Sequence, residues 1–168
     1  MFAPLIATIL LGQNSPVGKT APEFIGSQWL NADRPLKIAD RKGKVTVVYF
    51  WTFACYNCKN NMPAVKRIAE AFKKDGVETI SIHTPEIAEE KVVGNVKKAV
   101  ERHGIKYPVL IDGDYANWRA WGTSAWPTIL VIDKHNKIQS VWEGELNYGN
   151  QNGEAKISSI IRKLLSEK

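Results

Sequence analysis

The sequence predicts an α/β protein in which helices flank a central mixed β-sheet. An unbroken run of apolar, β-branched and aromatic residues, VTVVYFW at residues 45–51, has the length and composition of a strand covered on both faces. Segments with helical spacing alternate with further strand-like runs, as they do in βαβ units. The chain has 168 residues and no Pro-, Gly- or Ser-rich linker, so it is long enough to bury one sizeable core. We therefore expect one folded domain over residues 21–168.

The expected elements follow in order along the chain. After the strand at 45–51, apolar residues recur at helical spacing from Met62 to Phe72, until Asp75 and Gly76 end the helix. Next come a strand at 77–82, a helix at 91–103 with Val92, Val96 and Val100 on one face, and a short strand at 107–111. The remaining elements are a short helix at 116–121, a hairpin of strands at 128–132 and 138–142, and a terminal helix with an apolar stripe from Ile157 to Leu165.

The first twenty residues form a separate N-terminal segment in this prediction. Residues 2–11, FAPLIATILL, are as long as the apolar core of a signal peptide, and far shorter than the roughly 20 residues that span a bilayer. No Lys or Arg precedes this run, and the first basic residue is Lys19. Two interpretations therefore stay open: an export signal, or a strand or helix that packs on the domain.

Charge and cysteine content narrow the class of function. The net charge of +6 comes from lysines and arginines that are interspersed with acids, which indicates a solvated surface rather than a nucleic-acid site. With two cysteines only, the chain has no framework of several structural disulfides. All thiol chemistry is therefore expected in one place.

The two cysteines stand where the apolar strand meets the following helix, in the segment WTFACYNCKNNMP. Unpaired N–H groups at a helix N-terminus stabilise an anion, so we expect Cys55 to be a thiolate near neutral pH and Cys58, one turn further in, to stay protonated. The three-residue spacing brings the sulfurs within disulfide reach. The pattern predicts thiol–disulfide exchange without a cofactor, in which Cys55 attacks and Cys58 resolves the mixed disulfide.

Three other interpretations of the pair are weaker. A zinc site needs four ligands, but there is no second Cys pair, and His83, His103 and His135 form no close pair. Covalent haem attachment needs a histidine where Lys59 stands. A purely structural disulfide would close a very short loop and remove little chain entropy. We expect neither a metal nor a cofactor.

Beyond the CxxC pair, an ordered set of short motifs resembles known redox proteins. FWTFAC, Pro63 after the second cysteine, and Trp126-Pro127-Thr128 before a late strand resemble thioredoxin. A greater similarity is to TlpA/ResA-type redoxins, and it rests on GKVTVVYFW, YPVLID and WPTILVID, with a segment inserted before the last of them. HTPE, GNV, DGDYANW and GELNY resemble the C-terminal redoxin domain of DipZ-like proteins. The resemblance covers residues 21–168.

The resemblance implies a thioredoxin-like fold with an N-terminal extension and an insertion before the strand that follows a cis Trp126–Pro127 bond. The loop with Pro127 should face the two sulfurs, and the backbone of Trp126 should pair with a substrate strand. Trp51 is expected at the same substrate-binding surface. The ring of Trp126 either offers apolar contact to a substrate or belongs to the core, and both interpretations stay open.

Two positions depart from the pattern of these families. Tyr49 stands where thioredoxins keep a buried acid, and Asn61 where ResA-like proteins often carry a glutamate. The best replacement is Glu86, because it follows a strand whose C-terminal end should open beside the cysteines. Glu86 either takes the proton of Cys58 or caps the next helix as a first-turn acid. His83, at the end of the same strand, is expected to be a core histidine.

These features predict a thiol:disulfide oxidoreductase. By analogy with the families above, it reduces disulfides of exported proteins, as in cytochrome c maturation, and a membrane protein of the DipZ or CcdA type supplies its electrons. We expect protein thiol or disulfide substrates, no nucleic acid, a monomer and an extracytoplasmic location, with a cytoplasmic one left open. The dipeptide between the cysteines is one of several controls of the reduction potential, so the direction of electron flow stays open at this point.

Two alternative functions remain. A copper chaperone would use Cys55, Cys58 and a histidine as soft ligands for Cu(I), but proteins of that kind usually space the cysteines by three residues. A thiol peroxidase would have Thr52 in place, but Val48 stands where a proline is needed.

Overall fold

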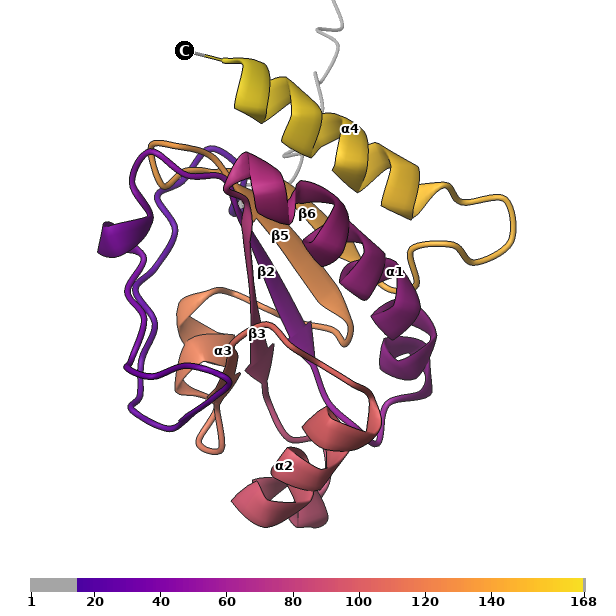
Figure 1. Cartoon of the computed structure of the whole chain (residues 1–168). Helices are drawn as coiled ribbons and strands as arrows, with labels where there is room; N and C mark the ends of the chain where they lie inside the picture. The colour runs from indigo at the N-terminus through magenta and orange to yellow at the C-terminus, as the bar shows by residue number, and fades with distance from the viewer. Residues whose placement is uncertain (1–14, 168) are drawn as a thin grey trace, which may run out of the picture.

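The computed structural model describes residues 15–167, which form a six-stranded sheet in the order β1-β4-β3-β2-β5-β6 (Figure 1). The strands are β1 Trp29–Leu30, β2 Thr46–Trp51, β3 Glu78–His83, β4 Val109–Ile111, β5 Thr128–Ile132 and β6 Ile138–Glu143. β3 is parallel to both β2 and β4, whereas β5 is antiparallel to both β2 and β6, and β1 is antiparallel to β4. The sheet is therefore mixed, and the apolar strand β2 lies inside it, as predicted.

Helices cover both faces of the sheet. They are α1 Tyr56–Phe72, α2 Val93–Arg102, α3 Ala116–Ala120 and α4 Gly153–Ser166, with short 3-10 helices η1 Ala39–Arg41, η2 Lys73–Asp75 and η3 Ala88–Lys91. Buried side chains of α1, α2 and α4 share one core cluster, and the tryptophans at α3 belong to the other. Figure 1 shows α3 on the opposite side of the sheet from α1 and α4. Between β3 and β5 the chain runs through η3, α2, β4 and α3, where the resemblance places the insertion.

Strand β2 is apolar from Val47 to Trp51 because it supplies both cores. Val47, Tyr49 and Trp51 point to the cluster under α1, α2 and α4, whereas Val48 and Phe50 point to the cluster beside α3. Successive side chains of a strand face opposite sides, so a strand covered on both sides needs an apolar residue at each position. All six residues of β2 are buried.

Helix α1 ends where the sequence predicts. Met62, Val65, Ile68 and Phe72 are buried on the face that packs on the sheet. The chain then makes one 3-10 turn and stops at Gly76, whose φ of 79° lies in the left-handed region that a glycine adopts without strain.

The segment after β3 differs from the prediction. Helix α2 begins at Val93, because the preceding 3-10 turn η3 ends at Lys91 and Val92 has an extended backbone. Val92 is 55% exposed and does not share the buried face of Val96 and Val100, so its predicted place in the core is wrong. Strand β1 was not predicted, because its two residues are too few to show any periodicity.

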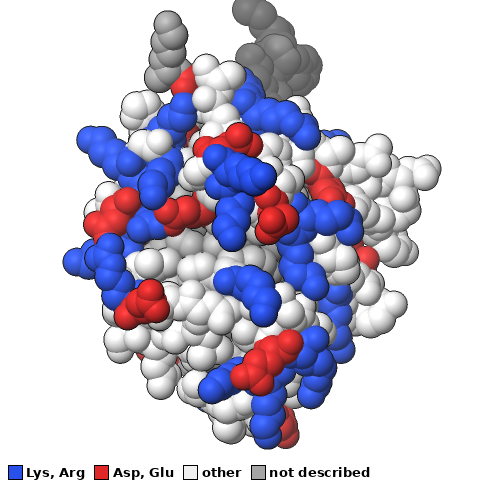
Figure 2. Space-filling view, viewed as in Figure 1, with Lys and Arg blue, Asp and Glu red and all other residues white. Residues whose placement is uncertain are grey.

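Most of the predicted N-terminal segment, residues 1–20, lies outside the described residues. The two interpretations of its apolar run, an export signal or a packed element, concern residues outside the described part. The last residues of the segment pair with the β5–β6 turn: Thr20 forms an isolated antiparallel bridge with Lys137, and the N–H of Gly18 donates to the carbonyl of Ile138 at 2.7 Å. Within residues 15–167, no helix combines the length and the apolar character needed to cross a membrane. Figure 2 shows basic and acidic side chains interspersed over one face, as the sequence indicates.

Candidate active site

Cys55 occupies the N-cap position of α1, after a short turn, residues 52–54, that follows β2. Its backbone is extended, with φ −67° and ψ 120°, and its Sγ accepts the backbone N–H of Cys58 at 3.2 Å. A cap of this kind satisfies one of the N–H groups that a helix leaves unpaired at its start, with sulfur in the place of the usual side-chain oxygen. The side chain of Cys55 is partly exposed, whereas Cys58 is wholly buried, and both are thiols.

The two thiols differ strongly in acidity. Hydrogen bonds from the thiol and the backbone N–H of Cys58 lower the pKa of Cys55 to about 7, even though partial burial opposes this. Burial, reinforced by the hydrogen bond to Cys55, raises the pKa of Cys58 far above its ordinary value. The accessible sulfur is therefore the one that ionises near neutral pH, and a thiolate is the nucleophilic form of cysteine.

The Trp126–Pro127 peptide bond is cis, as the resemblance implies. It immediately precedes β5, where Thr128 pairs with Phe50 near the end of β2, so this loop and the CxxC turn lie at the same edge of the sheet. Trp126 is partly buried against the core cluster that also takes Cys55 and Phe53, and Pro127 is buried. The ring of Trp126 therefore packs on the edge of the core and keeps part of its surface open.

Trp51 does not lie at this surface. Its side chain is wholly buried, and its indole N–H donates to the hydroxyl of Ser81 at 3.2 Å. As the last residue of β2 it follows the alternation of the strand into the core cluster under α1, α2 and α4. The expectation that Trp51 contacts a substrate is therefore wrong.

Glu86 is exposed and lies near both sulfurs, since its charge raises the pKa of Cys55 and of Cys58. It does not cap the next helix. The 3-10 helix η3 begins at Ala88 with Ile87 as its N-cap, and the acids of its first turn are Glu89 and Glu90. The capping interpretation of Glu86 is therefore wrong, and the proton-transfer interpretation stays a prediction.

Glu90 is a residue of this site that the sequence did not reveal. It is 1% exposed, and its Oε1 accepts the backbone N–H of Ala54 at 2.6 Å. Its Oε2 accepts the N–H groups of Glu86 at 2.7 Å and Ile87 at 3.2 Å. Burial acts to raise the pKa of Glu90, but the hydrogen bonds outweigh it and the pKa is lowered. In the sequence, Glu90 stands in the run EEK, which is typical of a solvated turn.

His83 is a core histidine, as predicted. It is wholly buried, and its ring lies 5.6 Å from that of Phe53 in a stacked arrangement and 5.0 Å from that of Trp51 edge to face. Its Nε2 is 3.9 Å from Oε1 of Glu90. Burial lowers the pKa of His83 to about 4, so the imidazole is neutral at neutral pH.

The two departures from the family pattern have structural roles. The hydroxyl of Tyr49 donates to the carbonyl oxygen of Cys58 at 3.0 Å, and burial raises the pKa of this phenol well above 10.0. The side-chain amide of Asn61 donates to the carbonyl of Gly144 at 2.9 Å and accepts the N–H of Leu146 at 2.8 Å. Asn61 thus joins α1 to the loop that follows β6, and neither side chain supplies a carboxylate for the proton of Cys58.

Ligands for a metal are sparse in the part of the chain that the structure describes. It contains no group of three or more His, Cys, Asp or Glu side chains placed to hold an ion. No histidine therefore joins the cysteine pair in a three-ligand set of the kind that the copper-chaperone interpretation requires.

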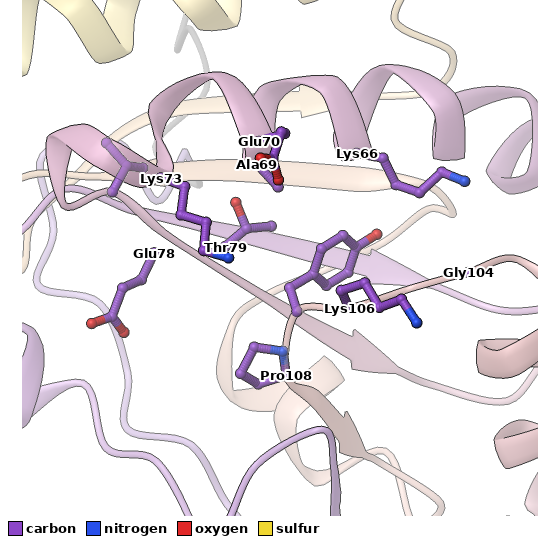
Figure 3. Close-up of a pocket in the computed structure, with 11 residues that line it drawn as sticks. Lys66, Ala69, Glu70, Lys73, Glu78, Thr79, Gly104, Lys106 and Pro108 are labelled. Atoms are coloured by element: carbon purple, nitrogen blue, oxygen red, sulfur yellow. The ribbon is translucent and has the colours of Figure 1, made fainter.

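A cavity of about 500 Å³ lies away from the cysteines, between the second half of α1 and the start of β3 (Figure 3). Figure 3 shows Lys66, Glu70 and Lys73 on the α1 side and Thr79 on β3. Since β2 and β3 are parallel, the start of β3 and the end of β2 are at opposite edges of the sheet. The Nζ of Lys66 donates to the carbonyl of His103 at 2.9 Å, so this lysine is already paired within the fold.

Comparison with known proteins agrees with this geometry. The model of the AhpC/TSA family matches residues 17–141. Protein DipZ of Mycobacterium bovis is 34% identical over 151 residues, which make up 88% of this chain and 21% of DipZ. The chain thus spans about a fifth of the length of that relative.

A second relative is covered over most of its length. The thiol-disulfide oxidoreductase ResA of Geobacillus thermodenitrificans is 32% identical over 130 residues, which make up 77% of this chain and 71% of ResA. Among solved structures, a thioredoxin-like superfamily protein superposes with a TM-score of 0.78 at 25% identity, over 89% of this chain and 97% of that protein. The fold is thioredoxin-like.

Proposed function

Because this chain belongs to the AhpC/TSA family and is a redoxin of the thiol-disulfide oxidoreductase class, we propose that Cys55 and Cys58 are its redox pair and that it reduces disulfides in other proteins. The observation that carries the proposal is the hydrogen bond from the N–H of Cys58 to the sulfur of Cys55. It holds the exposed sulfur at a helix N-terminus, where the thiolate is stabilised, and it keeps the buried sulfur within one helical turn.

In the first step, the Cys55 thiolate attacks one sulfur of a substrate disulfide. A bond forms between the Cys55 sulfur and that sulfur, the substrate S–S bond breaks, and the second substrate sulfur leaves as a thiolate and takes a proton from solvent. With a pKa of about 7, roughly half of Cys55 is ionised at neutral pH. The sulfur is therefore both nucleophilic and accessible.

In the second step, Cys58 resolves the mixed disulfide. Its thiol gives up a proton, its sulfur attacks the Cys55 sulfur, and the remaining substrate sulfur leaves as a thiolate. The proton needs an acceptor, because burial raises the pKa of Cys58. Once Cys55 is in the mixed disulfide, it no longer carries the charge that disfavours ionisation of Cys58, and Glu86 is the nearby carboxylate that takes the proton, directly or through water.

The surroundings of Cys55 support a polypeptide substrate. Tyr56 is 72% exposed and Ile87 is 43% exposed, and both adjoin residues of the site in sequence. With the open part of Trp126, they offer apolar surface to an extended or unfolded segment. We propose that Trp126 and Pro127 line this segment and that the backbone of Trp126 pairs with it.

The cellular setting of the reaction is part of the same proposal. An apolar run at residues 2–11 and the similarity to DipZ support an extracytoplasmic domain, residues 21–168, preceded by an N-terminal segment, residues 1–20, whose last residues pair with β6. The substrates are then disulfides of exported proteins, including those handled in cytochrome c maturation. A membrane protein of the DipZ or CcdA type returns two electrons to the Cys55–Cys58 disulfide, and the domain acts as a monomer.

Trapping of the mixed disulfide tests the proposal. Cys58→Ser retains attack and accumulates a covalent adduct with a disulfide-containing peptide, whereas Cys55→Ser gives no adduct and no reduction. Mass spectrometry of the wild-type protein, with and without reductant, should show a difference of two hydrogen atoms. An adduct on Cys58 rather than Cys55 would reverse the assignment. Turnover of hydrogen peroxide, or tight binding of Cu(I) without disulfide exchange, would favour the alternative functions.

A further inference from the structure

Two loops at the active site share one buried carboxylate. Glu90 accepts the N–H of Ala54, which directly precedes Cys55, and the N–H groups of Glu86 and Ile87 in the loop after β3. The distances are 2.6, 2.7 and 3.2 Å, in that order. This one side chain therefore connects the segment that presents the attacking sulfur to the segment that carries Glu86.

The charge of Glu90 depends on these three hydrogen bonds and on the side chain of Thr52, which also lowers the pKa of this carboxyl group. A buried carboxylate is strongly disfavoured unless groups in its surroundings replace its hydration. Among the described residues, the one potential cation near Glu90 is His83, at 3.9 Å, and burial keeps that imidazole neutral. The three backbone N–H groups contribute to this compensation beside the Thr52 side chain, and each of them must point at the carboxylate to do so. The backbone at Ala54 is held in place as a result.

Fixing Ala54 fixes the conformation of Cys55. The Cys55 sulfur caps α1 only with the extended backbone that the structure shows, because this conformation turns the side chain back toward the N–H of Cys58. A rotation of the Ala54–Cys55 segment would take the sulfur out of reach of that N–H. The low pKa of Cys55 depends on the same hydrogen bond.

We propose that Glu90 is a positioning residue for disulfide exchange: its buried carboxylate holds Ala54 so that the Cys55 sulfur stays at the N-terminus of α1, and holds Glu86 in the loop beside it. The inference rests on the proposed role of Cys55 as the attacking sulfur. Glu90 itself touches neither the substrate nor a reacting atom, since it is wholly buried behind the loop.

The direction in which the pKa of Cys55 shifts in Glu90 variants separates a positioning role of Glu90 from a direct electrostatic effect of its charge. A carboxylate near a thiol raises the pKa of the thiol, because like charges repel. Loss of the Glu90 charge removes this repulsion and, by itself, lowers the pKa of Cys55. Loss of the Ala54 anchor has the opposite effect, since it releases the sulfur from the helix N-terminus. A higher pKa of Cys55 in Glu90 variants is thus specific to positioning.

The test uses the reduced protein and two variants of Glu90. Glu90→Gln removes the charge and leaves one acceptor oxygen for three N–H donors, and Glu90→Asp keeps the charge but is one methylene too short to reach both loops. Glu89→Gln, an exposed neighbour in the same 3-10 turn, is the matched control. The rate of alkylation of Cys55 by iodoacetamide is followed against pH, with mass spectrometry to identify the modified cysteine and near-UV circular dichroism to verify the fold.

We expect the pKa of Cys55 to rise from about 7 toward the ordinary thiol value near 8.5 in both Glu90 variants and to stay unchanged in the control. At pH 7 the thiolate fraction then falls up to about 15-fold, which a more nucleophilic thiolate offsets in part, so alkylation slows about threefold. At pH 10 the same variants react up to about fivefold faster than the wild type. The alkylation rates of the wild type and of the Glu90 variants, plotted against pH, therefore cross, and this crossing indicates a positioning role of Glu90.

An unchanged or lowered pKa of Cys55 in both folded variants would overturn the proposal. Loss of the fold in both would overturn it as well, because Glu90 would then act on the whole molecule rather than on Cys55. The outcome is independent of the proposed function, because alkylation needs no substrate. If the wild-type protein fails to reduce any disulfide, the function is wrong, yet the pH profiles still report on Glu90.

Discussion

The phenol of Tyr49 donates a hydrogen bond to the carbonyl oxygen of Cys58 at 3.0 Å. It comes from the middle of β2 and reaches the first turn of α1, at the strand position where thioredoxins keep an acid. Burial raises the pKa of this phenol, so it stays a neutral donor over the physiological pH range. Tyr49 therefore steadies the backbone of the resolving cysteine and takes no proton from it.

Tyr49→Phe is accordingly expected to change stability rather than chemistry. Loss of one buried hydrogen bond should lower the free energy of unfolding by about 1 kcal/mol. The rate of resolution of the mixed disulfide should change by less than about twofold, because a neutral phenol is not a general base. Urea melts and stopped-flow measurements on the same preparation check the two statements. Resolution slowed tenfold or more would mean that the phenol takes part in proton transfer.

The reactivity of Cys55 should follow the titration of a single thiol with a midpoint near pH 7, the value to which its hydrogen bonds lower its pKa. Between pH 6 and pH 8 its thiolate fraction, and with it the rate of alkylation by iodoacetamide, should rise about tenfold. Cys58 should stay unmodified over this range, since burial raises its pKa. Faster labelling of Cys58 than of Cys55 would contradict the assignment of attacker and resolver.

Glu86→Gln separates proton transfer from an electrostatic effect. The charge of Glu86 raises the pKa of both cysteines, so its removal alone should make both sulfurs more acidic and leave resolution unchanged or faster. If Glu86 takes the proton of Cys58, resolution should slow instead, since general-base help is typically worth about 10²–10⁴-fold. We expect slower resolution and an equally fast first attack, measured by stopped flow. Glu89→Gln is the control for the loss of one exposed acid, and resolution as fast as in the wild type would exclude the relay.

Asn61 should be important for stability and not for redox chemistry. Asn61→Ala leaves the carbonyl of Gly144 and the N–H of Leu146 without their partner in a buried setting, at a cost of about 2–4 kcal/mol for the two groups. The exposed neighbour Asn60→Ala should cost less than about 0.5 kcal/mol. Urea melts give the comparison, and the pKa of Cys55 should be the same in both variants. A shifted pKa would show that the loop after β6 acts on the redox pair.

The fold was predictable where side-chain periodicity repeats over several turns or strand residues. β2 falls within the residue range expected for it, and α1 carries the predicted apolar face, because the apolar positions alone specify a doubly covered strand and a one-sided helix. β1 has two residues, and Val92 lies at a break between two helical turns, so neither leaves a periodic signal. The sequence shows that these segments are apolar but not where the backbone turns.

The site was predictable only where its chemistry is carried by residue type. Cys55 and Cys58 can hardly be anything but a thiol pair, whereas Glu90 and Glu86 are both glutamates in one acidic loop, and only the backbone path buries the first and exposes the second. Trp51 was misplaced for a related reason. An unbroken apolar strand does not tell which of its residues faces the opening at its end, and here the last one turns into the core.

The register of β5 against β2 determines where the WPT loop lies relative to Cys55. The pairing of Phe50 with Thr128 brings the end of β2 and the start of β5, more than seventy residues apart in the chain, to the same edge of the sheet. A slip of one residue in this ladder would move the WPT loop by about 3.3 Å and turn its side chains to the other face, away from the sulfurs. In the connection between β3 and β5, β4 is held by its own ladders to β3 and β1. The segments on either side of β4 can differ in length without moving the WPT loop relative to Cys55, so the surface around the sulfurs can vary while the reacting groups stay in place.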